Sequence, residues 1–160
     1  IVGNLSVAFG VGVIPYWGSI AVFPNKLLIM FPLAFAIFIM EIGREIMVNI
    51  GDIKGDLKAK FKTLPVQIGR QKSMFIALLF YLLFIPLFPF AYFNGLFGYI
   101  YIIGGIILSI SLILTWYLTY KEIKTNNEEK IWNAFEKYER VGTRVMIIVF
   151  QLFILLEVFY

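Results

Sequence analysis

The stretch EIGREIMVNIGDIKGD, residues 41–56, leads out of one hydrophobic segment toward the next and carries acidic side chains at helical spacing. At about 100° per residue, five polar side chains fall within roughly 80° of one another on a continuous helix. They are Glu41, Glu45, Asn49, Asp52 and Asp56. Acids this close repel one another unless a cation lies between them. Because the donors are oxygen atoms and the chain has no His or Cys, the stretch predicts a site for a hard cation, Mg²⁺.

The composition is that of an integral membrane protein. Of the 160 residues, 61% are hydrophobic and 15% are charged, and the mean hydropathy is +0.87. Soluble domains are only about 45–50% apolar. Apolar stretches of about 20 residues, enough to cross a hydrocarbon core of roughly 30 Å, recur along the chain. The sequence therefore predicts an all-α membrane bundle with five transmembrane helices, near residues 1–23, 26–47, 72–92, 96–120 and 144–160.

Basic residues gather in the two segments that follow the second and fourth predicted spans. Residues 44–72 and 121–144 contain 13 of the 14 Lys and Arg residues, and the exception is Lys26. An up-and-down path puts both segments on one side of the membrane, and the positive-inside rule makes that side cytoplasmic. We therefore expect the N-terminal end to lie in the cytoplasm and the C-terminal end to lie at the opposite face of the cell membrane.

The two basic segments differ in their patterns. Residues 44–72 are predicted to form a cytoplasmic Asp-rich loop, in which Thr63-Leu-Pro65 is expected to end the helical run. Residues 121–144 are predicted to form a cytoplasmic amphipathic loop, because Ile131, Phe135 and Tyr138 repeat at helical spacing among charged residues. This pattern predicts a short helix in the headgroup plane. No internal repeat or low-complexity linker divides the chain, so all 160 residues are treated as one bundle.

The acidic stripe has a functional and a structural interpretation. Asp52 and Asp56, four residues apart, are neighbours on a helix and can hold a divalent ion from one side. Alternatively, both are solvated charges that pair with nearby lysines. Glu41 and Arg44, three residues apart, can neutralise each other as a buried pair. The functional interpretation is favoured for the aspartates because the same face continues through Glu45 into the membrane, where acids are costly and usually functional.

Several bases follow the aspartates. Lys58 and Lys62 are candidate diphosphate contacts, because cations beside a metal-binding acid pair suit a polyanionic substrate. They can equally be topogenic charges, which is the preferred interpretation for Lys60 and Arg70. Among the 17 Phe and 9 Tyr residues, a few could line a cavity in which a carbocation forms, because ring faces stabilise cations.

Residues 43–56, GREIMVNIGDIKGD, followed by KTLP at 62–65 and Ile68-Gly69, resemble the second aspartate-rich region of the UbiA superfamily of intramembrane prenyltransferases. The likeness is greatest to the archaeal branch that makes digeranylgeranylglyceryl phosphate, where R-E-x-x-K-D-I-E-D-x-E-G-D and then K/R-T-L-P are usual. Asn49 stands where that pattern usually has Asp. The opening GNLSVA at residues 3–8 looks like the start of the preceding span, which adds Asn4 to the candidates.

The resemblance implies a Mg²⁺-dependent enzyme of membrane phospholipid biosynthesis. It would transfer a polyprenyl group, geranylgeranyl, from its diphosphate to a glyceryl-phosphate lipid. Asp52 and Asp56 would be the catalytic and metal-binding acids. The substrate-binding residues would be Asn4, Arg44, Glu45, Asn49, Lys58 and Lys62.

Family members are nine-helix bundles in which two aspartate-rich motifs face each other, and this chain resembles the last five helices. We therefore expect preceding helices that carry the first motif. Three alternatives stay open. The acceptor could be an aromatic ring, as in quinone, haem or chlorophyll pathways. The acidic stripe could conduct cations in a transporter or channel, or the chain could be a non-catalytic membrane scaffold. No nucleic-acid partner is expected.

Overall fold

The computed structural model describes residues 6–12, 14, 27–125 and 127–159, and no β-strand occurs among them. Residues 6–12 are helical. The helices that follow are α2 (Leu27–Gly51), α3 (Ile53–Lys58), α4 (Leu64–Ile68), α5 (Arg70–Leu87), α6 (Phe90–Phe93), α7 (Tyr99–Ile123), α8 (Glu128–Ala134), the π-helix η2 (Phe135–Thr143) and α9 (Arg144–Phe159). The all-α prediction is confirmed. Most of the first predicted span, with Asn4, lies outside the described residues.

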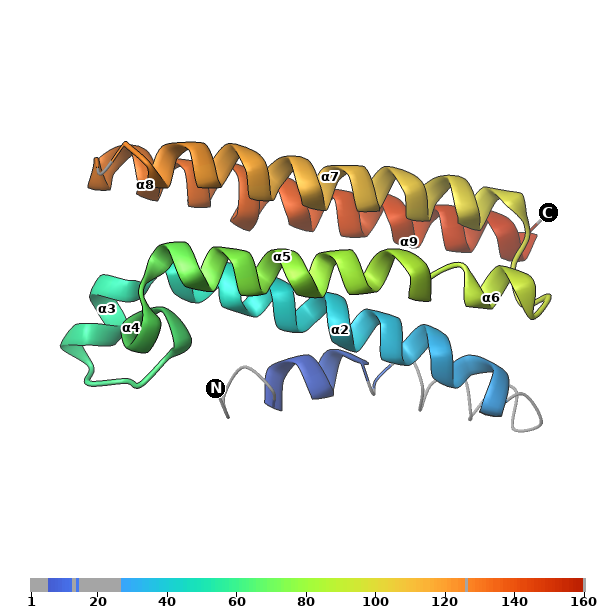
Figure 1. The fold of residues 1–160 in the computed structure, drawn as a ribbon. Helices are drawn as coiled ribbons and strands as arrows, with labels where there is room; N and C mark the ends of the chain where they lie inside the picture. Colours follow the sequence, from blue (N-terminus) through green and yellow to red (C-terminus); the bar gives the residue numbers. More distant parts are fainter. Residues whose placement is uncertain (1–5, 13, 15–26, 126, 160) are drawn as a thin grey trace.

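Long helices lie side by side and form one elongated bundle (Figure 1). α2 packs along α5, α5 contacts α7, and α7 packs along α9. η2 also contacts α2. The core between them contains fully buried aromatic side chains, among them Tyr81, Phe84 and Tyr101. The Tyr101 hydroxyl donates to the Phe88 carbonyl at 2.6 Å, so its polar end is satisfied inside the bundle.

Within the residues that the structure describes, two segments have the length and composition of a membrane span. They are Arg70–Phe93, with 24 residues, and Tyr99–Ile123, with 25 residues. These segments overlap the predicted spans 72–92 and 96–120. Large apolar side chains such as Phe93 and Ile110 are exposed on the outer surface of the bundle. A surface of this kind is expected to contact lipid.

The helix predicted to run unbroken through residues 41–56 is divided. α2 ends at Gly51, and Asp52 is the N-cap of α3 with φ −89° and ψ 7°. Glycine is a poor helix former, and α3 buries none of its six residues, so little packing holds it in line with α2. The backbone N–H of Asp56 still donates to the Asp52 carbonyl at 3.0 Å, so the two aspartates remain one turn apart.

The prediction that Thr63-Leu-Pro65 ends the helical run was wrong. The run has already ended at Lys58, and Lys60 adopts a φ of 57° in the connection. Thr63 is the extended N-cap of α4, and Pro65 lies in its first turn. Proline is favoured there because the first N–H groups of a helix have no intrahelical acceptor.

The prediction of a short helix within residues 121–144 was also wrong. α8, η2 and α9 follow one another without a break from Glu128 to Phe159, so the segment is the first part of a long helix. Its apolar face packs inward, because α8 contacts α7 and η2 contacts both α2 and α7. Ile131 and Phe135 are therefore buried, and Tyr138 is half-buried.

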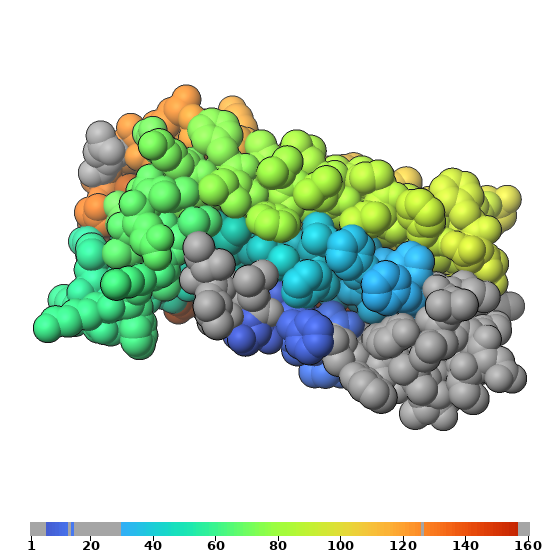
Figure 2. All heavy atoms as spheres, turned by 60° about the horizontal axis from the view of Figure 1, so that its bottom comes forward, coloured from blue at the N-terminus to red at the C-terminus, as the bar shows by residue number. Residues whose placement is uncertain are grey.

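The two basic segments lie at the same end of the bundle, as predicted. α3, α4 and α8 lie at this end, whereas α6 and the end of α9 lie at the other end (Figure 1). Figure 2 shows the same arrangement from another side, with the green atoms of the α3–α4 region and the orange atoms of the α8 region gathered at one end.

Gly43 permits close contact between α2 and α5. A Cβ at this position would lie 2.9 Å from the Tyr81 ring and 3.1 Å from the Ala77 carbonyl oxygen. Because Tyr81 is fully buried and cannot move aside freely, we expect Gly43→Ala to lower the free energy of unfolding by about 1–3 kcal/mol. Thermal unfolding in detergent would measure the loss. Gly55→Ala is the matched control, because a Cβ there meets nothing within 4 Å, and equal effects of both variants would contradict the prediction.

Candidate functional site

A polar pocket of about 650 Å³ lies at the end of the bundle that carries the basic segments. Its wall combines both signs of charge with the indole of Trp132. The ionisable residues in the wall are Asp52, Lys54, Asp56, Arg70, Glu128 and Glu129. Asp52 lies at the N-cap of α3 and Asp56 lies in its first turn, and α8 supplies the glutamates. The structure thus brings together both aspartates that the sequence predicted.

Each aspartate has a partner that the sequence did not single out. The Thr63 hydroxyl donates to Asp56 Oδ2 at 2.8 Å, and Arg140 Nη2 donates to Asp52 Oδ1 at 3.1 Å. Arg140 also pairs with Glu136 at 3.1 Å, and its guanidinium lies 5.3 Å from the Trp132 ring centroid. Arg140 is 88 residues from Asp52. The four-residue spacing to Glu136 is the only local signal in the sequence that marks this arginine as half of an ion pair.

The aspartates fit one side of a metal site. Carboxylate oxygens are the donors that Mg²⁺ prefers, and the two side chains lie one helical turn apart on a pocket wall. In the part of the chain that the structure describes, no group of three or more His, Cys, Asp or Glu side chains could hold a metal ion. Asp52 and Asp56 could therefore offer ligands from one side of such a site.

The inner part of the predicted acidic stripe is paired with an arginine within the bundle. Arg44 Nε lies 2.7 Å from Glu41 Oε2, and Arg44 Nη2 lies 2.9 Å from Glu45 Oε1. Of the Glu41 side chain only 5% is exposed, and of the Arg44 side chain 17%. The structure thus shows the buried ion pair that was the structural interpretation of Glu41 and Arg44, with Glu45 as a third member. None of the three lines the pocket.

Among the described residues, the other predicted substrate contacts lie apart from the pocket, and Asn4 is outside the described residues. Asn49 has a buried side-chain nitrogen without a hydrogen-bond partner among the described residues. Lys58 and Lys62 are exposed, and neither lines the pocket. The bases in the pocket wall are instead Lys54 and Arg70.

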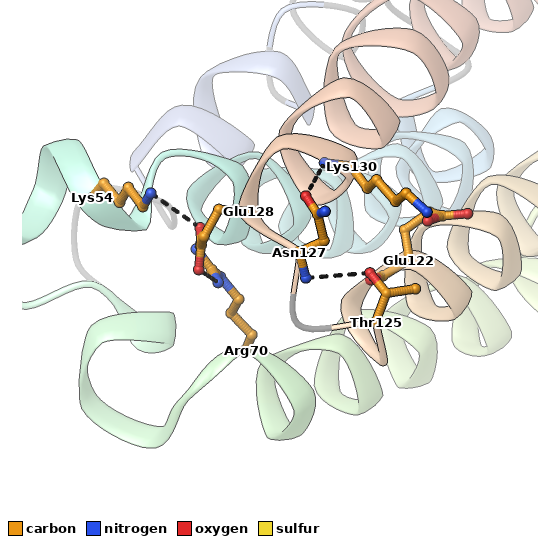
Figure 3. A network of polar contacts seen from close by, with 7 residues as sticks. All are labelled: Lys54, Arg70, Glu122, Thr125, Asn127, Glu128 and Lys130. Carbon is orange, nitrogen blue, oxygen red and sulfur yellow. Dashed lines mark hydrogen bonds and ion pairs between the residues drawn. The ribbon is translucent and has the colours of Figure 1, made fainter.

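Arg70 and Lys54 both contact Glu128 (Figure 3). The two terminal nitrogens of Arg70 lie 2.6 and 2.9 Å from the two oxygens of Glu128, and Lys54 Nζ lies 3.4 Å from Oε2. The hydrogen bonds from Arg70, with a smaller contribution from Lys54, lower the pKa of Glu128 to about 2. Glu128 is therefore ionised at neutral pH. The sequence favoured a topological role for Arg70. Its partner Glu128 is 58 residues away, so the spacing of nearby residues could not indicate the contact.

Glu139 on η2 is a second acid that the sequence did not single out. Only 2% of this residue is exposed, and Oε2 accepts a hydrogen bond from the Thr143 hydroxyl at 3.2 Å. Oε1 has no partner within the described residues. Burial raises the pKa of Glu139 from its ordinary 4.5 to about 8, although the nearby Arg44 acts in the opposite direction. Glu139 is therefore protonated at neutral pH.

The raised pKa of Glu139 makes stability depend on pH. Folding binds a proton wherever the unfolded chain has lost it, so the free energy of unfolding should fall as pH rises from 4.5 to about 8. The slope is at most about 1.4 kcal/mol per pH unit. We expect Glu139→Gln to flatten this decline in thermal unfolding measured in detergent between pH 5 and 8. Glu129→Gln, at an exposed position, is the control, and parallel curves for wild type and Glu139→Gln would contradict the prediction.

Comparison with known proteins assigns the chain to a class. Residues 1–138 match the model of the UbiA prenyltransferase family. The chain belongs to this family. Its members are integral membrane proteins, in agreement with the two span-length helices.

Curated relatives give a more specific likeness. The chain is 28% identical over 151 residues to the digeranylgeranylglyceryl phosphate synthase of Methanosphaera stadtmanae, covering 94% of this chain and 53% of the relative. It is 32% identical over 148 residues to the protein of that name from Sulfurisphaera tokodaii, covering 91% and 51%. The Thermococcus gammatolerans protein of that name is 42% identical over 79 residues, covering 49% and 28%. The chain thus spans about half the length of the first of these relatives. No solved structure matches it significantly.

Proposed function

We propose that the chain forms the C-terminal part of a prenyltransferase that moves a geranylgeranyl group from its diphosphate to a glyceryl-phosphate lipid. The observation that carries this proposal is the pocket at one end of the apolar bundle, whose wall contains both Asp52 and Asp56 and the bases Lys54 and Arg70. Acids for a divalent cation and bases for a polyanion are the groups that a prenyl diphosphate requires. The printed names of the relatives favour the glyceryl lipid as acceptor.

In the proposed reaction, the bond between the prenyl carbon and the diphosphate oxygen breaks, and an ether bond to the acceptor hydroxyl forms as its proton is released. Bound Mg²⁺ supplies positive charge that stabilises the leaving diphosphate. Asp52 and Asp56 would hold the ion from one side. The Thr63 hydrogen bond fixes one Asp56 oxygen, which orients the carboxylate. The apolar helices would keep water from the reacting carbon.

The proposal extends to the membrane arrangement. Five transmembrane helices would place the Asp-rich loop in the cytoplasm, at the end where the basic segments meet. Preceding helices with a first aspartate-rich motif would supply the remaining metal ligands, in keeping with relatives that are about twice as long. Asn4, Asn49, Lys58 and Lys62 are proposed as further substrate contacts. Arg44 and Glu45 do not line the pocket, so they would influence substrate binding indirectly, by holding α2 in position.

The test is transfer of radiolabelled geranylgeranyl from its diphosphate by the full-length protein in detergent, with and without Mg²⁺. We expect label on geranylgeranylglyceryl phosphate only when Mg²⁺ is present. If label appears only on an aromatic acceptor, the proposed prenyl transfer stands, but the acceptor is an aromatic compound and not the glyceryl lipid. Absence of diphosphate release with every acceptor would contradict the proposal. Mg²⁺-independent ion flux in liposomes would then support a transporter.

A further inference from the structure

We propose that Lys54 and Arg70 form the diphosphate-binding face of the pocket, and that Glu128 occupies this face until the diphosphate displaces it. The inference rests on the proposed function, because it concerns the same pocket. It assigns substrate binding to two bases that differ from Lys58 and Lys62, and it gives an acid on α8 the role of a competing anion.

The geometry of the Arg70–Glu128 contact is that of anion recognition. Both terminal nitrogens of the guanidinium point at the two carboxylate oxygens, and Lys54 approaches one of these oxygens from α3 (Figure 3). A guanidinium fork binds a phosphate group in the same two-pronged way. The Glu128 carboxylate therefore lies where a phosphate of the substrate would lie.

Exposure indicates which partner can leave. Of the Arg70 side chain 19% is exposed, against 47% of the Glu128 side chain and 67% of the Lys54 side chain. The Nε atom of Arg70 is buried without a hydrogen-bond partner among the described residues. Arg70 is therefore the partly buried partner, which keeps its place in the wall, whereas the half-exposed Glu128 side chain has solvent into which it can turn once another anion binds Arg70.

Charge favours the exchange. Glu128 brings one negative charge to two cations, whereas a diphosphate brings about three and offers more acceptor oxygens. Lys54 lies between Asp52 and Asp56 in sequence, and all three line the pocket with Arg70. A diphosphate on Lys54 and Arg70 would thus lie next to the acids proposed to hold Mg²⁺. Its arrival would also release α8 from the start of α5.

The test measures binding of inorganic diphosphate with Mg²⁺ to the full-length protein by titration calorimetry. Glu128→Gln and Glu129→Gln change the net charge equally, and both positions line the pocket. We expect Glu128→Gln to tighten binding by about tenfold, because it removes the competing charge, and Glu129→Gln to change it by less than about twofold. Arg70→Gln should weaken binding by about tenfold or more, and Arg70→Lys by less, because Lys keeps the charge but not the fork. Lys72→Gln, which is exposed and outside the pocket, is the control for charge.

The outcomes separate this inference from the proposed function. Equal effects of the two glutamate variants, or weaker binding by Glu128→Gln, would overturn the inference. A purely structural ion pair predicts that Glu128→Gln lowers thermal stability without tightening binding, which would overturn it as well. Prenyl transfer by the wild-type preparation is measured in parallel. If transfer occurs but Glu128→Gln does not tighten binding, only the inference fails, whereas absence of both transfer and diphosphate binding contradicts both proposals.

Discussion

Replacing Asp52 or Asp56 with Asn is expected to reduce Mg²⁺-dependent prenyl transfer by about a thousandfold, with little change in the fold. Each substitution removes one of the negative charges proposed to hold the ion. A bound metal ion stabilises the charge that develops in the transition state of such reactions by several kcal/mol. Asn retains an oxygen that can accept the Thr63 hydrogen bond at position 56. At position 52, Asn loses the negative charge that pairs with Arg140, and a partly exposed ion pair of this kind contributes only about 0–1 kcal/mol.

Transfer of radiolabelled geranylgeranyl, measured over a range of Mg²⁺ concentrations, would check this result, and thermal unfolding would check the fold. Glu122→Gln is a suitable control, because this acid lies near the same end of the bundle but does not line the pocket. If either aspartate variant transfers the label normally at any Mg²⁺ concentration that supports the wild type, that aspartate is not a ligand of the metal.

The second large effect is expected at Arg44. Arg44→Met should lower the free energy of unfolding by about 3–5 kcal/mol, because it leaves the buried Glu41 without its partner and deprives Glu45 of its counter-charge. Met keeps an unbranched apolar side chain at this position but cannot neutralise either acid. Loss of the charge-assisted hydrogen bonds at 2.7 and 2.9 Å adds to the penalty.

A compensated variant separates charge from packing. Glu41→Gln and Glu45→Gln, combined with Arg44→Met, remove the whole cluster, and removal of all members of a buried ion cluster is often neutral or stabilising. We expect the triple variant to recover most of the stability that Arg44→Met loses, as measured by thermal unfolding in detergent. If Arg44→Met alone unfolds at the wild-type temperature, the cluster does not stabilise the bundle.

Local pattern predicted part of the candidate site and missed the rest for a definite reason. Asp52 and Asp56 could be found because a four-residue spacing places side chains one turn apart on any helix. Arg140, Arg70 and Glu128 could not, because their contacts join residues 88 and 58 positions apart. The same limit applies to Glu41 and Arg44. Their spacing allowed both a buried pair and a free acidic stripe, and only packing decided between them.

The sequence by itself determined that the chain is all-helical, that its apolar segments are long enough to span a membrane, and that the Asp-rich region resembles the UbiA family. The first two properties follow from apolar transfer energy and backbone periodicity, which act within about 20 residues, whereas the resemblance rests on the residues of the Asp-rich region themselves. The tertiary structure decided that the acidic helix breaks after Gly51, that the amphipathic segment continues into α9, and that Lys54 and Arg70 line the pocket. These features depend on which faces of distant helices pack together, and that depends on the whole bundle rather than on any one segment.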